Sequence, residues 1–284
     1  MTLDSAHAQS LAAKTPLLRQ WLQSVMAVVF PSPCVLCHGE LTASLAGGLC
    51  AECWSGLECW SGSLCFRCGL PLAAIVDSPR FLCADCRLRE PHFDFARSYG
   101  VYAGRLRAAV LQLKFHRREI LGKRLGRLLL DPWLSLESDL PSRDATLIIP
   151  VPLHRSRERE RGYNQAELLA RGLLGAMKKR VGIRQGRLEQ RAVSRTHPTL
   201  PQSGLSLQGR SENVRKAFEV VNPELLRERD VILVDDVMTT GATASACAAA
   251  LRRAGARRVV VLTLARATPQ FPDVSAVSAR WSAT

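Results

Sequence analysis

The sequence predicts an α/β protein in which a parallel sheet flanked by helices follows a small cysteine-rich module. Two short apolar segments, Thr146 to Val151 and Val231 to Val234, have the β-branched composition of strands buried in a parallel sheet. Each segment runs into a polar loop and then into a stretch rich in helix-forming residues. Four C-x-x-C pairs precede both strands, between residues 34 and 90. We therefore expect an N-terminal segment over residues 1–33, the cysteine-rich module over 34–90 and the α/β domain over 91–284.

Length and composition favour a globular protein. The chain has 284 residues with 47% hydrophobic content, and its mean hydropathy is near zero. No apolar run approaches the roughly 18 residues that a membrane helix needs, so we expect no membrane span. The apolar segment Val25 to Phe30 lacks both the basic flank and the cleavage site of a signal peptide. We therefore expect a cytoplasmic location.

The formal net charge of +14 is concentrated in two blocks. Residues 97–128 contain nine Lys/Arg and one acidic residue, and residues 151–198 contain twelve and four. A polyphosphate ligand, nucleic acid or a simply solvated basic surface would each account for such blocks. Charge alone leaves these three interpretations open.

The first element in chain order is an expected amphipathic helix from Thr15 to Phe30. Leucines, Trp21, Val25 and Val28 recur there at helical spacing, and prolines follow directly. We expect this helix to pack on the rest of the protein, because it lacks the basic face of a membrane-surface helix.

The eight cysteines of residues 34–90 have the spacing of zinc ligands. A C-x-x-C turn presents two thiolates to one ion, and two such turns complete a closed tetrahedral site. Because we expect no secretion, a disulfide framework is disfavoured. Taken in order, the pairs predict two structural Zn²⁺ ions with these ligand sets: Cys34, Cys37, Cys50 and Cys53, then Cys65, Cys68, Cys83 and Cys86. Spacing does not decide which pairs share an ion, so interleaved pairing stays open.

The α/β domain begins with a strand over Phe95 to Tyr102 and a helix over Gly104 to Lys114, in which Leu106, Val110 and Leu113 share one face. Residues 131–145, which contain prolines, serines and acids, are interpreted as a connection. The strand Thr146 to Val151 follows.

An arginine-rich loop comes after that strand, and a helix is expected from about Asn164 to Lys179. A strand, an arginine-bearing loop and a helix form an arrangement suited to clamping pyrophosphate. The candidate residues are Pro152, Leu153, His154, Arg155 and Arg161, with Tyr163, Asn164 and Gln165 nearby. A solvated Arg/Glu helix face is the alternative interpretation.

Residues Arg191 to Phe218 carry few strand or helix signals, and a polar loop of this length is often a lid or disordered. Arg195 or Arg210 could close over a bound pyrophosphate. A last strand is expected over Arg258 to Leu264.

The segment VILVDDVMTTGATASACAAAL, residues 231–251, places two carboxylates beside a candidate phosphate cradle. Asp235 and Asp236 stand at the carboxyl end of the strand, where ligands bind in open α/β sheets. The next residues open a helix, whose N-terminal N–H groups and dipole favour an anion. These residues are Thr239, Thr240, Gly241, Ala242 and Thr243. The segment suits a ligand that carries a phosphate together with diol or metal groups, although a generic strand–loop–helix unit would also produce it.

Together these segments resemble the ComF family of phosphoribosyltransferase-like proteins. The resemblance rests on the paired C-x-x-C ribbons, Tyr102 to Phe115, Pro150 to Ala166, Thr196 to Phe218 and VDDVMTTGAT, and covers roughly residues 30–266. It implies a type I phosphoribosyltransferase fold, a site for phosphoribosyl pyrophosphate (PRPP) with Mg²⁺, and a link to DNA uptake in competence or to the use of external DNA.

The resemblance also implies roles for individual residues. Asp235 and Asp236 would hold the ribose hydroxyls, and Thr239 to Thr243 the 5-phosphate. The loop from Pro152 to Arg155 with Arg161 would hold pyrophosphate, and the expected catalytic residues are Asp235, Asp236, Arg155 and Arg195. The acceptor of the ribosyl group is not implied.

Three functions are compatible with the sequence. The first is pentosyl transfer from PRPP by an active phosphoribosyltransferase. The second is a PRPP sensor without catalysis, and the third is a factor of a DNA-import complex that binds single-stranded DNA. Few aromatic residues accompany the basic blocks, so base-stacking platforms are not obvious.

Overall fold

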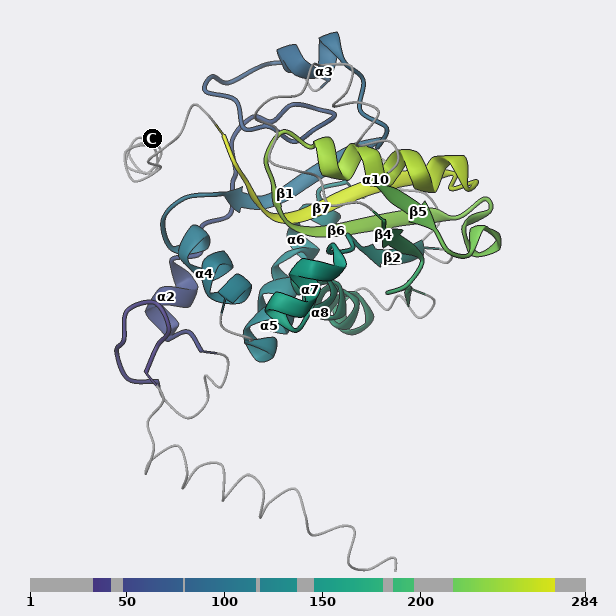
Figure 1. Cartoon of the computed structure of the whole chain (residues 1–284). Coiled ribbons are helices and arrows are strands. Elements are labelled where there is room, and N and C mark those ends of the chain that lie inside the picture. Colours follow the sequence, from purple (N-terminus) through teal and green to yellow (C-terminus); the bar gives the residue numbers. More distant parts are fainter. Residues whose placement is uncertain are drawn as a thin grey trace, which may run out of the picture. The chain divides into compact units, whose positions relative to one another are not determined.

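The structure is a computed structural model that describes residues 33–41, 48–78, 80–115, 118–136, 146–180, 186–196 and 217–268 (Figure 1). The expected helix from Thr15 to Phe30 and the candidate Arg210 lie outside these residues. The chain divides into two compact units, one ending at Ser55 and one beginning at Gly56. Among the helices of the described ranges, none has the length and apolar composition needed to cross a membrane.

A five-stranded parallel sheet forms the centre of the second unit, with strand order β1-β7-β6-β2-β3. Its strands are β1 (Phe95–Val101), β2 (Thr146–Pro150), β3 (Arg187–Leu188), β6 (Asp230–Met238) and β7 (Arg258–Arg266). The predicted α/β class is confirmed, and so are the four predicted strands. The strand β6 extends past the predicted Val234, so that Asp235 and Asp236 lie within it.

The helices cover both faces of this sheet. In Figure 1, α10 (Ala242–Arg253) lies on one face, and the helices between β1 and β3 gather on the other. These helices are α4 (Gly104–Phe115), α5 (Glu119–Leu128), α6 (Leu130–Leu134), α7 (Arg155–Arg161) and α8 (Gln165–Arg180). Short elements complete the described chain: α2 (Ala51–Ser55), α3 (Ala84–Leu88), a 3₁₀ turn (Pro223–Leu226), and the antiparallel pair β4 (Val193–Arg195) and β5 (Phe218–Val220).

The central strands are apolar on both sides because both sheet faces are covered. Val231 and Leu233 of β6 belong to the same buried cluster as Cys247 and Leu251 of α10. The alternate residue Ile232 is also buried, and successive strand residues point to opposite faces. This double burial explains the continuous apolar run that predicted the strand.

Three helices correct the sequence interpretation. The expected connection over residues 131–145 begins with α6, where Trp133 is buried and Pro132 occupies the first turn, a position that proline tolerates. The helix α5 contains the basic residues at the end of the 97–128 block, over which no helix or strand was predicted. The arginine-rich segment expected to be a loop forms α7, which has no buried residue and therefore gave no periodic apolar signal.

Helices α5 and α8 cross at almost backbone contact. A Cβ at Gly172 would lie 2.1 Å from the Lys123 carbonyl oxygen, and one at Gly126 would lie 2.2 Å from the Leu169 carbonyl oxygen. Only glycine allows this approach, since backbone atoms cannot move aside cheaply. The close crossing positions α8, whose first residue, Gln165, reaches the strand β6.

We predict that Gly172→Ala lowers the free energy of unfolding by about 1–3 kcal/mol, because its methyl group forces α5 and α8 apart. Gly175→Ala is the matched control in the same helix, since a Cβ there meets nothing within 4 Å. It should raise stability by about 0.5–1 kcal/mol through helix propensity. Urea unfolding followed by circular dichroism measures both changes, and equal stabilities for the two variants would contradict the crossing.

Candidate functional site

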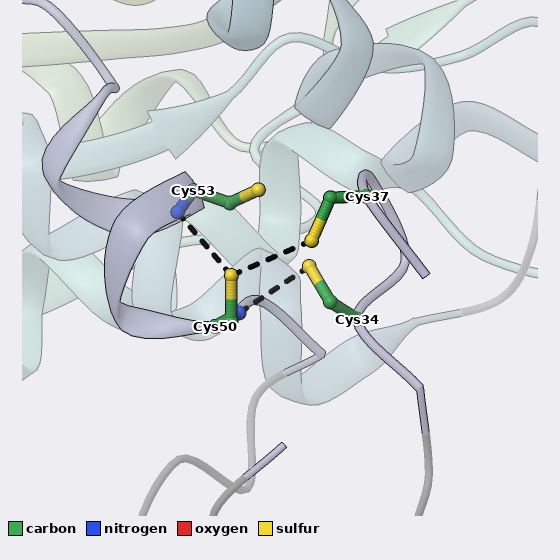
Figure 2. A group of neighbouring side chains, drawn as sticks. All are labelled: Cys34, Cys37, Cys50 and Cys53. Carbon is green, nitrogen blue, oxygen red and sulfur yellow. Dashed lines mark hydrogen bonds between the residues drawn. The ribbon is translucent and has the colours of Figure 1, made fainter. Parts of the chain in front are cut away.

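The first cysteine tetrad brings four sulfur atoms together. The Sγ atoms of Cys34, Cys37, Cys50 and Cys53 all lie within 4.8 Å of one another. Figure 2 shows these four side chains gathered together. The Cys37 and Cys50 sulfurs are 3.6 Å apart. A zinc ion about 2.3 Å from four tetrahedral sulfurs sets them about 3.8 Å apart, so the tetrad fits zinc. The backbone N–H of Cys50 donates to Cys34 Sγ at 3.3 Å, which further stabilises a thiolate.

The second tetrad repeats this geometry within the larger unit. The Sγ atoms of Cys65, Cys68, Cys83 and Cys86 also lie within 4.8 Å of one another. The Cys68 and Cys83 sulfurs are 3.6 Å apart, and the Cys83 N–H donates to Cys65 Sγ at 3.3 Å. Sequential pairing of the C-x-x-C turns is therefore confirmed, and the interleaved alternative is wrong.

Each tetrad contains a thiol whose pKa is lowered toward the thiolate form that binds zinc. Burial raises the pKa of Cys34, but hydrogen bonds from backbone N–H groups, including that of Cys50, outweigh burial and lower it to about 6. A hydrogen bond from the Cys68 thiol lowers the pKa of Cys65 to about 4, against the opposing effect of burial.

The two leading C-x-x-C turns are built alike. The N–H of Cys34 donates to the Gly39 carbonyl at 2.7 Å, and the N–H of Cys65 donates to the Leu70 carbonyl at 2.8 Å. The residue after the second cysteine has a positive φ in both turns, 61° at His38 and 63° at Gly69. The shared geometry shows that the two ribbons are structural repeats.

The second ribbon is packed against the sheet. A Cβ at Gly69 would lie 2.3 Å from the Ala96 carbonyl oxygen of β1, so glycine is required there for close packing as well as for its φ. The Ala96 N–H donates to the Arg67 carbonyl at 2.8 Å. Cys65, Cys68 and Cys83 accordingly belong to the buried cluster that contains the β6 and α10 side chains.

Asp236 of β6 is held from the α4 and α8 side of the sheet. Its Oδ2 accepts a hydrogen bond from Gln165 Nε2 at 3.1 Å and lies 3.2 Å from Lys114 Nζ. Its Oδ1 accepts from the Val237 N–H at 2.7 Å. Asp236 is only 5% exposed, so these partners supply the interactions that water would otherwise provide.

Asp235 points to the opposite face and is partly buried. Burial raises its pKa, and the charge of Asp236 raises it further, to about 8. The guanidinium of Arg195 on β4 interacts with this carboxylate, and the Arg195 guanidinium lies 5.5 Å from the Phe218 ring centre. The structure thus brings together Asp235 and Arg195, which the sequence analysis placed in one site.

The loop between β6 and α10 has the shape expected of an anion cradle. Thr239 and Thr240 are exposed, and Gly241 has a φ of 81° directly before the first residue of the helix, Ala242. The Ala242 N–H donates to Thr240 Oγ1 at 3.3 Å. The Arg266 guanidinium donates hydrogen bonds to the carbonyls of Met238 and Thr239 in this loop.

The arginine-rich segment that follows β2 begins as an extended turn, Pro152 to His154. His154 Nδ1 accepts from the Ser156 N–H at 3.3 Å and caps α7, which starts with the exposed Arg155. Arg161 ends this helix and lies over the Phe115 ring, 5.9 Å from its centre. Arg155 and Arg161 are therefore the two ends of one helix rather than members of one loop.

Sequence reasoning missed four residues that contribute to the site. Lys114 and Arg266 lie at the ends of α4 and β7, and Gln165 was noted only as a neighbour of the clamp. Arg157 of α7 is the fourth, since its charge adds to burial in lowering the pKa of Arg195. Their signal in the sequence is weak, because each acts through residues that are distant along the chain.

Comparison with known proteins gives one family model and several relatives. Residues 25–87 match the double zinc ribbon domain. The DNA utilization protein YhgH of Escherichia coli O6:H1 is 33% identical over 236 residues, which cover 83% of this chain and 97% of that protein. Competence protein F of Haemophilus influenzae is 32% identical over 238 residues, which cover 82% and 96%.

Two solved structures illustrate the more distant similarities. Glutamine phosphoribosylpyrophosphate amidotransferase from B. subtilis, complexed with ADP and GMP, is 20% identical, with a TM-score of 0.35 over 54% of this chain and 30% of that one. A hypoxanthine phosphoribosyltransferase from Staphylococcus aureus is 14% identical, with a TM-score of 0.32 over 52% and 66%. Similarities this loose carry no argument about activity.

The raised pKa of Asp235 predicts a loss of stability as the pH rises. The carboxyl has a pKa near 3.8 in the unfolded chain and about 8 in the fold, so only the folded state keeps this proton between those values. The stabilisation is complete below the unfolded pKa and is lost as the pH rises through the folded one, several kcal/mol in total because each pKa unit corresponds to about 1.4 kcal/mol. Asp235→Asn should reduce the fall between about pH 5 and pH 8 in urea unfolding. Identical pH profiles for this variant and the wild type would refute the shift.

Proposed function

Because the chain belongs to the family of competence protein F and the DNA utilization protein YhgH, we propose that it binds PRPP with Mg²⁺ and acts in DNA uptake or in the use of external DNA. The observation that carries this proposal is the pair Asp235 and Asp236 beside the loop that opens α10. Carboxylates that can accept hydrogen bonds from a diol and a phosphate cradle on one strand–loop–helix unit match the two ends of a ribose 5-phosphate.

The phosphate end of PRPP would occupy the loop. The N–H groups around Gly241 and at the start of α10 supply donors, and the hydroxyls of Thr239, Thr240 and Thr243 supply more. The helix α10 has 12 residues, so its dipole adds a favourable potential for the anion.

The ribose hydroxyls and the cation would meet the carboxylates. Asp236 is already held by Lys114 and Gln165, so Asp235 is better suited to interact with the ligand. Burial and, after it, the charge of Asp236 raise the pKa of Asp235, and a divalent cation beside it would favour its ionised form. Asp235 therefore fits a Mg²⁺ site, and a bound Mg²⁺ would supply positive charge that stabilises the pyrophosphate group as it leaves.

The arginines would bind pyrophosphate. Arg195 faces Asp235 and is close enough to Arg157 for their charges to interact, and Arg155 starts the same helix as Arg157. Two or more guanidinium groups on one side of the ribose would hold the leaving group through charge-assisted hydrogen bonds. In transfer, the bond between C1 of ribose and a pyrophosphate oxygen breaks, and an acceptor nitrogen forms the new bond to C1.

A PRPP sensor without catalysis uses the same residues. Binding without transfer requires the loop and the carboxylates but no acceptor pocket. Pyrophosphate release in the presence of Mg²⁺ and a panel of purine and pyrimidine bases distinguishes the two functions. Release with any base supports the transferase, and binding without release from the whole panel supports the sensor.

We predict that Asp235→Asn combined with Asp236→Asn weakens PRPP binding at least about tenfold, because charge-assisted hydrogen bonds are worth roughly 1.5–3 kcal/mol. Isothermal titration calorimetry with Mg²⁺ present measures the effect. Asp131→Asn, which alters an exposed carboxylate on α6, is the matched control and should bind as the wild type does. A wild-type protein that fails to bind PRPP, or a double variant that binds it normally, would defeat the proposed site.

A surface for single-stranded DNA is the second candidate function. Phe115 at the end of α4 is 65% exposed and lies within the basic block of residues 97–128. The Arg161 guanidinium lies over the Phe115 ring, 5.9 Å from its centre. An exposed aromatic ring among arginines is the combination on which bases of a single strand stack.

We predict that Phe115→Ala weakens binding of a fluorescent oligothymidine by about fivefold or more at low salt, since one stacked base is worth about 1–3 kcal/mol. Phe81→Ala is the matched control, because Phe81 pairs with Arg87 at the same 5.9 Å outside the basic block. Fluorescence anisotropy over a salt series measures both, and wild-type affinity should fall steeply with salt. Absence of binding at low salt would remove this candidate.

A further inference from the structure

Arg266, the last residue of β7, spans from the second cysteine tetrad to the phosphate loop. Its guanidinium donates to the Met238 carbonyl at 3.2 Å and to the Thr239 carbonyl. On the other side, its Nη2 lies 3.9 Å from Cys68 Sγ. Arg266 is only 5% exposed. One buried cation therefore contacts both a candidate zinc ligand and the backbone of the candidate phosphate cradle.

The thiolates of the zinc-loaded tetrad would supply the negative charge that stabilises Arg266, since Cys68 Sγ lies beside it. In the ranges that the structure describes, no carboxylate forms an ion pair with Arg266. A buried guanidinium without a counter-charge would be strongly unfavourable. A zinc ion with four thiolates carries an excess of negative charge, so the second site, when loaded, would supply a counter-charge for Arg266.

The contacts of Arg266, together with the Ala267 N–H that donates to the same Met238 carbonyl at 2.9 Å, orient the peptide groups of the loop. In a trans peptide unit the C=O group and the following N–H group point in opposite directions. Since the carbonyls of Met238 and Thr239 turn toward Arg266, the N–H groups of Thr239 and Thr240 point away from it. These N–H groups belong to the loop that precedes α10 and are available to an anion.

A second contact joins the ribbon side to the same loop. Phe93, in the segment between the second ribbon and β1, is buried, and a Cβ at Gly241 would lie 3.8 Å from its ring. The neighbouring His92 N–H donates to Ser245 Oγ of α10 at 3.1 Å. The loop is thus supported from the ribbon side by side-chain packing as well as by Arg266.

We propose that Arg266 is a positioning residue that couples the second zinc site to the phosphate loop, so that zinc bound at Cys65, Cys68, Cys83 and Cys86 keeps the loop in its anion-binding conformation. The inference rests on the proposed function, in which this loop binds the 5-phosphate of PRPP. Coupling between two sites is reciprocal, so an anion bound in the loop should in turn stabilise zinc in the second tetrad.

The test compares the full-length zinc-loaded protein with Arg266→Met, Arg266→Lys and the control Arg253→Met, which removes an exposed arginine from α10. Ribose 5-phosphate is the ligand probe, measured by calorimetry. Zinc transfer to a chromogenic chelator, with and without ribose 5-phosphate, is the second measurement. Metal content and circular dichroism establish that each variant is folded and loaded at the start.

We expect Arg266→Met to bind ribose 5-phosphate at least about tenfold more weakly, since it loses charge-assisted hydrogen bonds to the loop. One of the two zinc ions should leave it faster than it leaves the wild type. Ribose 5-phosphate should slow the release of that ion in the wild type and in Arg253→Met, but not in Arg266→Met. Arg266→Lys keeps the positive charge but cannot contact the loop carbonyls and Cys68 at the same time, so its effects should be intermediate. If Arg266→Met does not fold, the same comparisons are made with Arg266→Lys.

Unchanged ribose 5-phosphate affinity in Arg266→Met, or equal protection of its zinc by the ligand, would overturn the coupling while the proposed function survived. Failure of the wild type to bind PRPP or ribose 5-phosphate would instead count against the proposed function. In that case the rates of zinc release from Arg266→Met and from the wild type still test whether Arg266 stabilises the second tetrad. Equal rates would show that it does not.

Discussion

Two adjacent carboxylates on the buried central strand β6 are the constraint around which the larger unit is arranged. Because successive strand residues point to opposite faces, Asp235 and Asp236 have different nearest partners. Asp236 is held by Lys114 from α4 and Gln165 from α8, whereas Asp235 faces Arg195 from β4. The close crossing of α5 and α8 at their glycines positions α8. Gln165, at the start of α8, can therefore donate its hydrogen bond to Asp236.

Metal sites supplement the core in the cysteine-rich part of the chain, where short segments bury little apolar surface. The two ribbons share their turn geometry but differ in surroundings. The first C-x-x-C turn of the second ribbon packs against β1, where Gly69 contacts Ala96. The cysteines of this ribbon belong to the buried core that also contains β6 and α10 side chains. The second ribbon therefore supports the candidate ligand site. Arg266 connects the two directly, because it contacts both Cys68 Sγ and the Met238 carbonyl.

The elements that sequence reasoning predicted correctly are those with a strong local signal. The strands β2, β6 and β7 are apolar runs with covered faces, and α4 buries the predicted Leu106, Val110 and Leu113. The errors have physical causes. Helix α7 is almost entirely charged and buries no side chain, so no apolar period reveals it. Helix α6 has only five residues, too few to show a helical period.

The sequence by itself determined the zinc ligands, the carboxylate pair and the Thr/Gly loop, because each is a set of residues whose chemistry depends on close spacing along the chain. Only the tertiary structure decided which cysteine pairs share an ion and which side chains neutralise the carboxylates. Gln165 lies 71 residues from Asp236, and Arg266 lies 198 residues from Cys68. No local pattern encodes such contacts. They arise because a buried charge needs a partner, and folding determines which distant residue provides it.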